Sequence, residues 1–155
     1  MIRKMLVDDI DVVVDLELKL FSHPWRKMDF IYELMENPFA TYWVYEVDHK
    51  IIAYLGFWLD ENQIQITTLG VDSNQQNKGY AKALMNHLFS FAHKHEVDAL
   101  SLEVRESNLK AISLYEQFKF KKAAIRKGYY SHPDEDGILM LCDMKGDLIH
   151  ENISR

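Results

Sequence analysis

The stretch IQITTLGVDSNQQNKGYAKALMNHLFSFA, residues 64–92, contains the features that decide the fold. Ile64 and Ile66 place apolar side chains on one face of an expected strand, whereas Leu69 and Val71 fall on the other parity. Side chains alternate faces along a strand, so this change needs an extra residue or a change in which face is covered. We therefore predict a β-bulge at the two threonines between these pairs, a feature often found beside active sites.

A polar loop and an amphipathic helix follow this strand. Apolar residues repeat at helical spacing at Leu84, Met85, Leu88, Phe91 and Ala92. Helix N-termini favour anions, and a glycine such as Gly79 allows close approach of the backbone, so the segment predicts a phosphate site. The nucleotide motifs G-x-x-x-x-G-K and G-x-G-x-x-G are absent from the sequence. On composition alone, a polar turn that simply starts a helix is the favoured alternative.

Composition predicts one globular domain over residues 1–144 and a polar tail over residues 145–155. The chain has 155 residues, of which 48% are hydrophobic, which is enough for a single core. Lys and Arg number 18 against 24 acidic residues, for a net charge of −6. Such a chain is a poor candidate for direct nucleic-acid binding, but it suits a cationic substrate. We expect a monomer or a weak homodimer.

Cellular context follows from the cysteine count and from hydropathy. The one cysteine, Cys142, excludes an internal disulfide framework and lies in an apolar run, so we expect a buried thiol. The sequence contains no run of about 18 apolar residues, so no membrane span is predicted. We expect no signal peptide, no membrane association and a cytoplasmic protein.

The pattern along the chain predicts the order βααβββαβαββ, an α/β fold with a mixed sheet covered by helices. The strand of the opening stretch is the fourth of seven. The other expected strands cover residues 2–6, 41–47, 50–59, 99–104, 120–125 and 137–144, and the other expected helices cover residues 7–21, 28–35 and 108–118.

The loop pattern Gln76-x-x-Gly79-x-Ala81 resembles the signature of the GNAT superfamily of N-acetyltransferases, which bind acetyl-coenzyme A. The resemblance implies a GNAT-like fold with a bulged, splayed central strand. It implies that loop amides hold the pyrophosphate and that the backbone after the bulge lines the pantetheine and the thioester. The cofactor-binding residues implied are Leu69, Gly70, Val71, Gln76, Asn77, Lys78, Gly79, Tyr80, Ala81, Lys82 and Asn108.

A second block, LEVRESN at residues 102–108 followed by Ala111 and Leu114-Tyr115, resembles the ribosomal-protein-alanine N-acetyltransferases of the RimI type. Further matches lie at His23-Pro24-Trp25 and Tyr129-Tyr130. This resemblance implies transfer of an acetyl group to the N-terminal α-amine, of alanine by analogy, of a ribosomal protein. Lys119 departs from the pattern, because the family has glycine there.

By the same analogy Glu103 is the general base and Tyr115 the general acid. An α-amine has a pKa of about 8, so a modest base suffices, whereas lysine at about 10.4 demands more. Tyrosine is a weaker acid than a thiol, so Tyr115 is better described as a hydrogen-bond donor to the leaving sulfur. Asn108 and Tyr115, seven positions apart on one expected helix, lie about 10 Å apart on one face and could contact an elongated ligand twice.

Several alternatives remain open. Trp25, Tyr129 and Tyr130 are candidate walls of a peptide cleft, but Trp25 could equally anchor a helix turn. Glu103 could be a strand-end charge paired with Arg105 or a lysine, and Tyr115 a packing aromatic. The enzyme could act on a lysine side chain, a polyamine or an antibiotic, or the chain could be a non-catalytic coenzyme A-binding module. No metal requirement is predicted.

Overall fold

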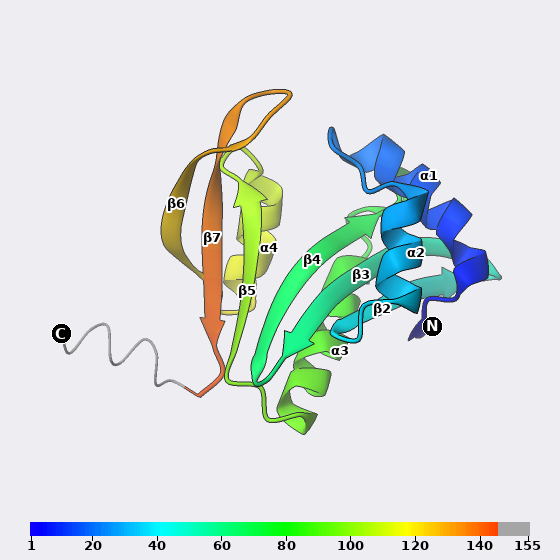
Figure 1. Ribbon diagram of the computed structural model, residues 1–155, viewed down its shortest axis with the longest axis horizontal. Helices are drawn as coiled ribbons and strands as arrows, with labels where there is room; N and C mark the ends of the chain where they lie inside the picture. The colour runs from blue at the N-terminus through cyan, green and yellow to red at the C-terminus, as the bar shows by residue number, and fades with distance from the viewer. Residues whose placement is uncertain (146–155) are drawn as a thin grey trace. The chain divides into compact units, whose positions relative to one another are not determined.

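The computed structural model describes residues 1–145. Its elements follow the predicted order βααβββαβαββ, which is confirmed (Figure 1). The strands are β1 (Ile2–Lys4), β2 (Ala40–Val47), β3 (Lys50–Asp60), β4 (Gln63–Val71), β5 (Ala99–Arg105), β6 (Lys121–Tyr130) and β7 (Glu135–Asp143). The α-helices are α1 (Ile10–Leu20), α2 (Lys27–Met35), α3 (Tyr80–Lys94) and α4 (Leu109–Gln117), and short 3-10 helices cover Val7–Asp9 and Ser73–Gln75.

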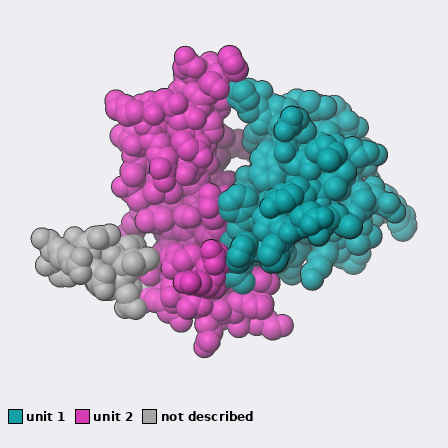
Figure 2. Space-filling view, viewed as in Figure 1, with its two compact units in different colours: residues 1–59, 67–90 teal, residues 60–66, 91–155 magenta. Residues whose placement is uncertain are grey.

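The strands form one mixed sheet in the order β1-β2-β3-β4-β5-β7-β6, in which β4 and β5 run parallel. The chain divides into two compact units, residues 1–59 with 67–90 and residues 60–66 with 91–155 (Figure 2). The prediction of a single domain over residues 1–144 stays a prediction. Apart from Lys145, the predicted tail lies outside the described residues.

Helices cover both faces of the sheet in the first unit. Tyr42 of β2 packs edge-on against Phe30 of α2, with ring centroids 5.9 Å apart. The next residue, Trp43, packs against His87 of α3, with ring centroids 4.4 Å apart. Consecutive strand residues point to opposite faces, so α2 and α3 lie on opposite sides of the sheet, as Figure 1 shows.

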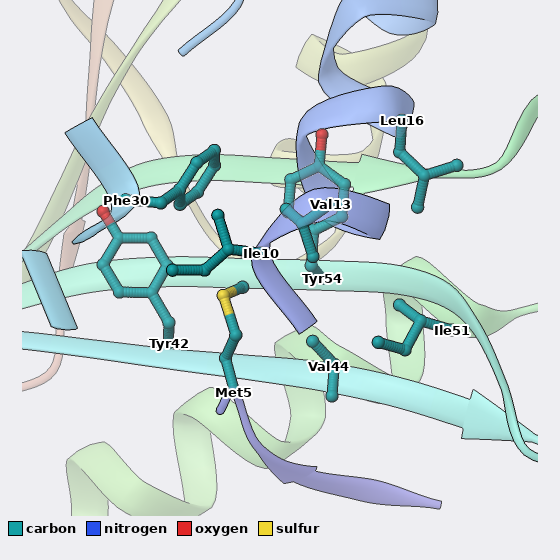
Figure 3. Packing of buried hydrophobic residues seen from close by; sticks show 9 residues of the cluster. All are labelled: Met5, Ile10, Val13, Leu16, Phe30, Tyr42, Val44, Ile51 and Tyr54. Atoms are coloured by element: carbon teal, nitrogen blue, oxygen red, sulfur yellow. The ribbon is translucent and has the colours of Figure 1, made fainter. Parts of the chain in front are cut away.

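The core of the first unit lies between the sheet and the pair α1 and α2. Apolar residues on α1 recur three positions apart and so form one buried stripe. The buried cluster shown in Figure 3 consists of Met5, Ile10, Val13, Leu16, Phe30, Tyr42, Val44, Ile51 and Tyr54. This packing fixes α1 and α2 over β2 and β3.

The predicted bulge in β4 is visible in the direction of two side chains. Thr68 Oγ1 donates to Glu17 Oε1 of α1 at 2.9 Å. Its neighbour Thr67 places Oγ1 3.1 Å from the hydroxyl of Tyr42, on the same helix-covered face. Two consecutive side chains on one face are what a β-bulge produces and what a regular strand cannot. The parallel pairs described between β4 and β5 start at Gln63 and end at Gln65, before the bulge.

The second unit contains an antiparallel arrangement of β5, β7 and β6. Cys142 of β7 is 3% exposed, which confirms the predicted buried thiol. Its Sγ lies 3.5 Å from the carbonyl oxygen of Phe118, at the end of α4, and burial raises its pKa to about 11. β6 extends to Tyr130, five residues beyond the predicted end, with a register irregularity between Arg126 and Tyr130.

Candidate active site

The loop after β4 is folded back onto the end of its strand. Gln76 Nε2 donates to the carbonyl oxygen of Val71 at 3.2 Å. Asp72 Oδ1 accepts from the amide of Asn74 at 3.1 Å and caps the short 3-10 helix. The Gln76 side chain therefore anchors the loop, and a contact of this residue with the coenzyme stays a prediction.

The turn into α3 uses two left-handed residues. Asn77 has φ 64° and Gly79 has φ 89°. A Cβ at Gly79 would meet nothing within 4 Å, so glycine is favoured there by the backbone conformation and not by lack of space. α3 begins at Tyr80, whose ring packs against Tyr45 of β2 at 4.9 Å. This contact fixes the direction of the N-terminus of α3.

The charges around this helix start suit an anion. The first amides of a helix have no intrahelical acceptor, and the helix dipole is positive there. The first turn of α3 contains no acidic residue but does contain the exposed Lys82. Lys78, also exposed, donates to Gln75 Oε1 at 3.2 Å. The positive lysine side chains and the positive end of the helix repel one another, and a bound negative group relieves this repulsion. The residues present therefore fit the phosphates of a coenzyme.

Gly70, after the bulge, lies directly beneath the ring of Tyr54. A Cβ at this position would be 2.5 Å from the Tyr54 hydroxyl oxygen and 2.6 Å from the adjacent ring carbon. Any side chain here would displace a fully buried tyrosine, so glycine is required for packing. The backbone from Leu69 to Val71, predicted to line the thioester, is thus held close to the core of the first unit.

In the second unit, Glu103 lies near the end of β5. Its Oε1 accepts from Arg126 Nε of β6 at 3.0 Å, while Oε2 is buried without a hydrogen-bond partner. The alternative of a strand-end charge in an ion pair is thus supported with Arg126 as the cation, whereas Arg105 pairs with Glu135 at 3.2 Å. Burial raises the pKa of Tyr129, and the charge of the Glu103 carboxylate and a hydrogen bond to it raise this pKa further. A carboxylate with one oxygen held and one buried and unpaired is suited to accept a proton.

Tyr115 is a buried residue of α4, packed against Phe120 with ring centroids 5.8 Å apart. Burial and the neighbouring phenol of Tyr130 raise its pKa well above the usual range. The phenol therefore stays protonated near neutral pH, which suits a hydrogen-bond donor. Tyr130 is itself influenced by Glu103, and burial raises its pKa to about 12. Tyr130 therefore interacts electrostatically with both predicted catalytic residues, Glu103 and Tyr115.

Asn108 differs from the sequence expectation. It is not a residue of α4 but its N-cap, with φ −81° and ψ 69°, and its Oδ1 accepts from the amide of Ala111 at 3.2 Å. The helix therefore begins one residue later than predicted, and the expectation that Asn108 shares a face with Tyr115 stays a prediction. Asparagine is strongly favoured as an N-cap, because its side chain satisfies a free helix amide. Contact of Asn108 with the coenzyme stays a prediction.

Tyr129 and Tyr130 stack edge-to-face at the end of β6, with centroids 4.9 Å apart. The guanidinium of Arg105 lies 4.6 Å from the centroid of the Tyr130 ring. The same guanidinium donates to the carbonyl oxygens of Ser131 at 3.1 Å and Pro133 at 3.0 Å. Arg105 therefore ties the connection between β6 and β7 to β5 and orients Tyr130.

Trp25 is half-buried and packs against the first unit's core. Its ring lies 5.5 Å from that of Phe30 and 6.1 Å from that of Tyr42. These contacts support the anchoring alternative, and a role for Trp25 in binding substrate stays a prediction.

Within residues 1–145, no group of three or more His, Cys, Asp or Glu side chains is placed to hold a metal ion. None of the described helices is both long enough and apolar enough to cross a bilayer.

Comparison with known proteins decides the family. A family model described as "Acetyltransferase (GNAT) family" matches residues 10–120. The chain belongs to the GNAT acetyltransferase family. It is therefore an acetyl-CoA-dependent N-acetyltransferase, and the predicted fold class is confirmed.

Named relatives within the GNAT family cover nearly the whole chain. A Bacillus subtilis (strain 168) protein, provisionally a ribosomal protein bS18-alanine N-acetyltransferase, is 35% identical over 90% of this chain and 92% of its own. The Escherichia coli (strain K12) ribosomal protein bS18-alanine N-acetyltransferase is 30% identical over 90% of this chain and 94% of its own. The crystal structure of the ribosomal-protein-S18-alanine N-acetyltransferase from Escherichia coli superposes with a TM-score of 0.86, at 27% identity over 93% of both chains.

Sequence reasoning gave no packing role to four charged residues that hold these parts of the GNAT fold in place. They are Glu17, Glu33, Arg126 and Glu135. Arg105 was expected only as a partner of Glu103, whereas it contacts the connection between β6 and β7. The two glutamates were detectable, because each occupies a position on the apolar, core-facing side of its helix. A charge at such a position signals a buried hydrogen-bond network.

Proposed function

We propose that this enzyme transfers the acetyl group of acetyl-CoA to the α-amine of an N-terminal alanine of a ribosomal protein. The substrate is suggested by the named relatives, which match the chain over nine-tenths of its length. The observation that carries the chemistry is Glu103, whose Oε2 is buried and unpaired while Oε1 is held by Arg126. This oxygen is available to accept a proton, and the neighbouring Tyr129 phenol is the group that interacts with the same carboxylate.

In the proposed reaction Glu103 takes a proton from the substrate ammonium, directly or through water. The neutral amine then attacks the thioester carbonyl, so that a C–N bond forms and the C–S bond breaks, and the second amine proton passes from nitrogen to the departing sulfur. A backbone amide between Leu69 and Val71 would stabilise the carbonyl oxygen as it becomes negative. Tyr115, protonated and buried, would donate to the departing sulfur. Acetyl-CoA supplies the activated acetyl group.

The start of α3 would hold the coenzyme through its phosphates. The left-handed Gly79, the free first amides and the cations Lys78 and Lys82 support this assignment. Gln76 would act through the loop that it anchors to Val71.

The substrate peptide would lie against aromatic residues. Tyr129 is about half exposed, at 52%, and Tyr130 is oriented by Arg105. These residues, with Trp25, remain the proposed walls of the peptide site. The acidic net charge of −6 suits a basic substrate segment.

The experiment that tests the proposal is a substrate panel read by mass spectrometry. The full chain is incubated with acetyl-CoA and a peptide with an N-terminal alanine, and the same peptide blocked at its α-amine but containing a lysine. Polyamines and aminoglycosides complete the panel. We expect acetylation only at the free α-amine. Transfer to lysine or to small amines alone would contradict the proposed substrate, and no transfer with coenzyme A still bound would indicate a non-catalytic module.

A further inference from the structure

The two bulge threonines are each connected to a buried glutamate that the proposed chemistry does not use. Glu17 of α1 is 1% exposed and Glu33 of α2 is 4% exposed. Burying a carboxylate is costly unless hydrogen bonds compensate for the lost water. Both carboxylates make their side-chain contacts on the face of the sheet where Thr67 and Thr68 point.

The first connection is direct. Thr68 Oγ1, in a residue that is itself 8% exposed, donates to Glu17 Oε1 at 2.9 Å. Tyr54 lies beside this pair, and its ring covers Gly70 two residues further along β4. Glu17 therefore holds the bulge immediately before the backbone that is proposed to line the thioester.

The second connection runs through a tyrosine. The Tyr42 hydroxyl donates to Glu33 Oε1 at 2.7 Å, so its oxygen is left to accept from Thr67 Oγ1 at 3.1 Å. Glu33 also accepts from Trp58 Nε1 and from Asn37 Nδ2, each at 2.6 Å. A carboxylate with three donors is rigidly placed, and it fixes Tyr42 and through it Thr67.

We propose that Glu17 and Glu33 are positioning residues, which hold the β4 bulge through Thr68 and Thr67 and thereby aim the backbone of Leu69–Val71 at the thioester. In a regular strand one of the two threonines would point to the opposite face. The hydrogen bonds to α1 and α2 favour the bulged alternative over the regular one. This inference rests on the proposed function, because it gives the bulge its catalytic purpose.

The test compares two variants at one position. Thr68→Val removes the hydroxyl but keeps the shape, whereas Thr68→Ser keeps the hydroxyl. We expect Thr68→Val to lower kcat for acetyl transfer by about tenfold or more, and Thr68→Ser to stay near the wild-type value, since only the valine variant lacks the hydroxyl that donates from β4 to Glu17. Equal kcat values for the two variants would overturn the proposal.

A combined variant separates positioning from stability. In Glu17→Met with Thr68→Val and Tyr54→Phe, the carboxylate and both neighbouring hydroxyls are replaced by apolar groups, so none of these three positions keeps an unsatisfied buried group and thermal stability should recover. If the pair positions the bulge, kcat stays low although the melting temperature returns. Recovery of both quantities together would show that the contact is only structural.

A binding measurement keeps this test independent of the acceptor. Without any amine present, calorimetry gives the dissociation constant of acetyl-CoA, and hydrogen exchange reports on the amides of residues 69–71. We expect weaker binding and faster exchange in Thr68→Val than in Thr68→Ser. If wild type acetylates no peptide, the proposed function fails, yet a difference between the variants still supports the bulge assignment. No difference would refute it.

Discussion

The carboxylate of Glu103 and the guanidinium of Arg126 form an ion pair at 3.0 Å across β5 and β6, and this pair leaves one oxygen of Glu103 buried and unpaired. The arginine is half-exposed, with 47% of its side chain accessible, whereas the glutamate side chain is 15% accessible. The ion pair therefore orients the carboxylate without consuming both of its acceptor oxygens.

Replacing Glu103 with glutamine should slow acetyl transfer. The amide keeps the shape but cannot accept a proton, and loss of a general base costs about 10²-fold or more. The defect in kcat/KM should shrink above about pH 8, because the α-amine is then already neutral in solution. Steady-state kinetics across this pH range check the prediction. Glu106→Gln, at an exposed position three residues away, is the control and should behave as wild type.

Tyr115→Phe should separate catalysis from coenzyme binding. The ring keeps its packing against Phe120, but the donor to the leaving sulfur is lost. We expect kcat to fall by about tenfold or more, while the dissociation constant of coenzyme A changes little. Turnover numbers and calorimetry on the same preparation measure the two quantities. An unchanged kcat would remove Tyr115 from the mechanism.

Arg105→Lys should weaken peptide binding more than it slows chemistry. The guanidinium contacts two carbonyl oxygens, Glu135 and the Tyr130 ring at once, and an ammonium cannot reproduce this planar arrangement. Tyr130 would then lose its fixed orientation. We expect KM for the peptide to rise by roughly fivefold or more, with a smaller change in kcat. A fall in kcat at constant KM would place Arg105 in the chemical step instead.

The features of this fold that the sequence predicts are those that depend on local residue patterns. The element order follows from apolar periodicity, and the bulge follows from the parity change between Ile66 and Leu69. Both depend on residues that are neighbours along the chain. The loop-to-helix start was found for the same reason, since its residues lie within a single short segment.

Contacts between distant residues were not predictable in this way. Thr68 and Glu17 are 51 residues apart, and nothing in either local pattern selects the other as partner. The extension of β6 shows the same limit. Gly128, with φ 61°, suggests a strand end, yet its amide donates to Asp136 Oδ1 at 2.9 Å, and strand pairing resumes at Tyr130.

Lys119→Gly should stabilise the protein. Lys119 is exposed and has φ 72° at the end of α4, a conformation that costs a side-chain-bearing residue about 1–2 kcal/mol. The greater freedom of glycine in the unfolded chain offsets part of this gain, which leaves roughly 1 kcal/mol. Urea unfolding measures the change. Lys122→Gly, in a strand, is the control and should destabilise the protein, and stabilisation in both variants would contradict the explanation.

Glu17→Gln should change the pH dependence of stability. Burial raises the pKa of Glu17 to about 7 from 4.5, against the opposing effect of its bonds to Thr68 and Tyr54. The folded state therefore binds a proton more tightly than the unfolded state. The stabilisation from this group is full below about pH 4.5, is lost as the pH rises to about 7, and is absent above that value.

The difference in unfolding free energy between wild type and Glu17→Gln isolates this contribution. Other groups, such as Asp9, whose pKa Arg3 lowers, act in the opposite direction but cancel in the difference. Wild type should gain up to about 3 kcal/mol relative to the variant between about pH 8 and pH 4.5. Urea unfolding at several pH values measures the gain. A difference independent of pH would mean that Glu17 keeps one protonation state throughout, and the buried carboxyl would then not titrate near neutral pH.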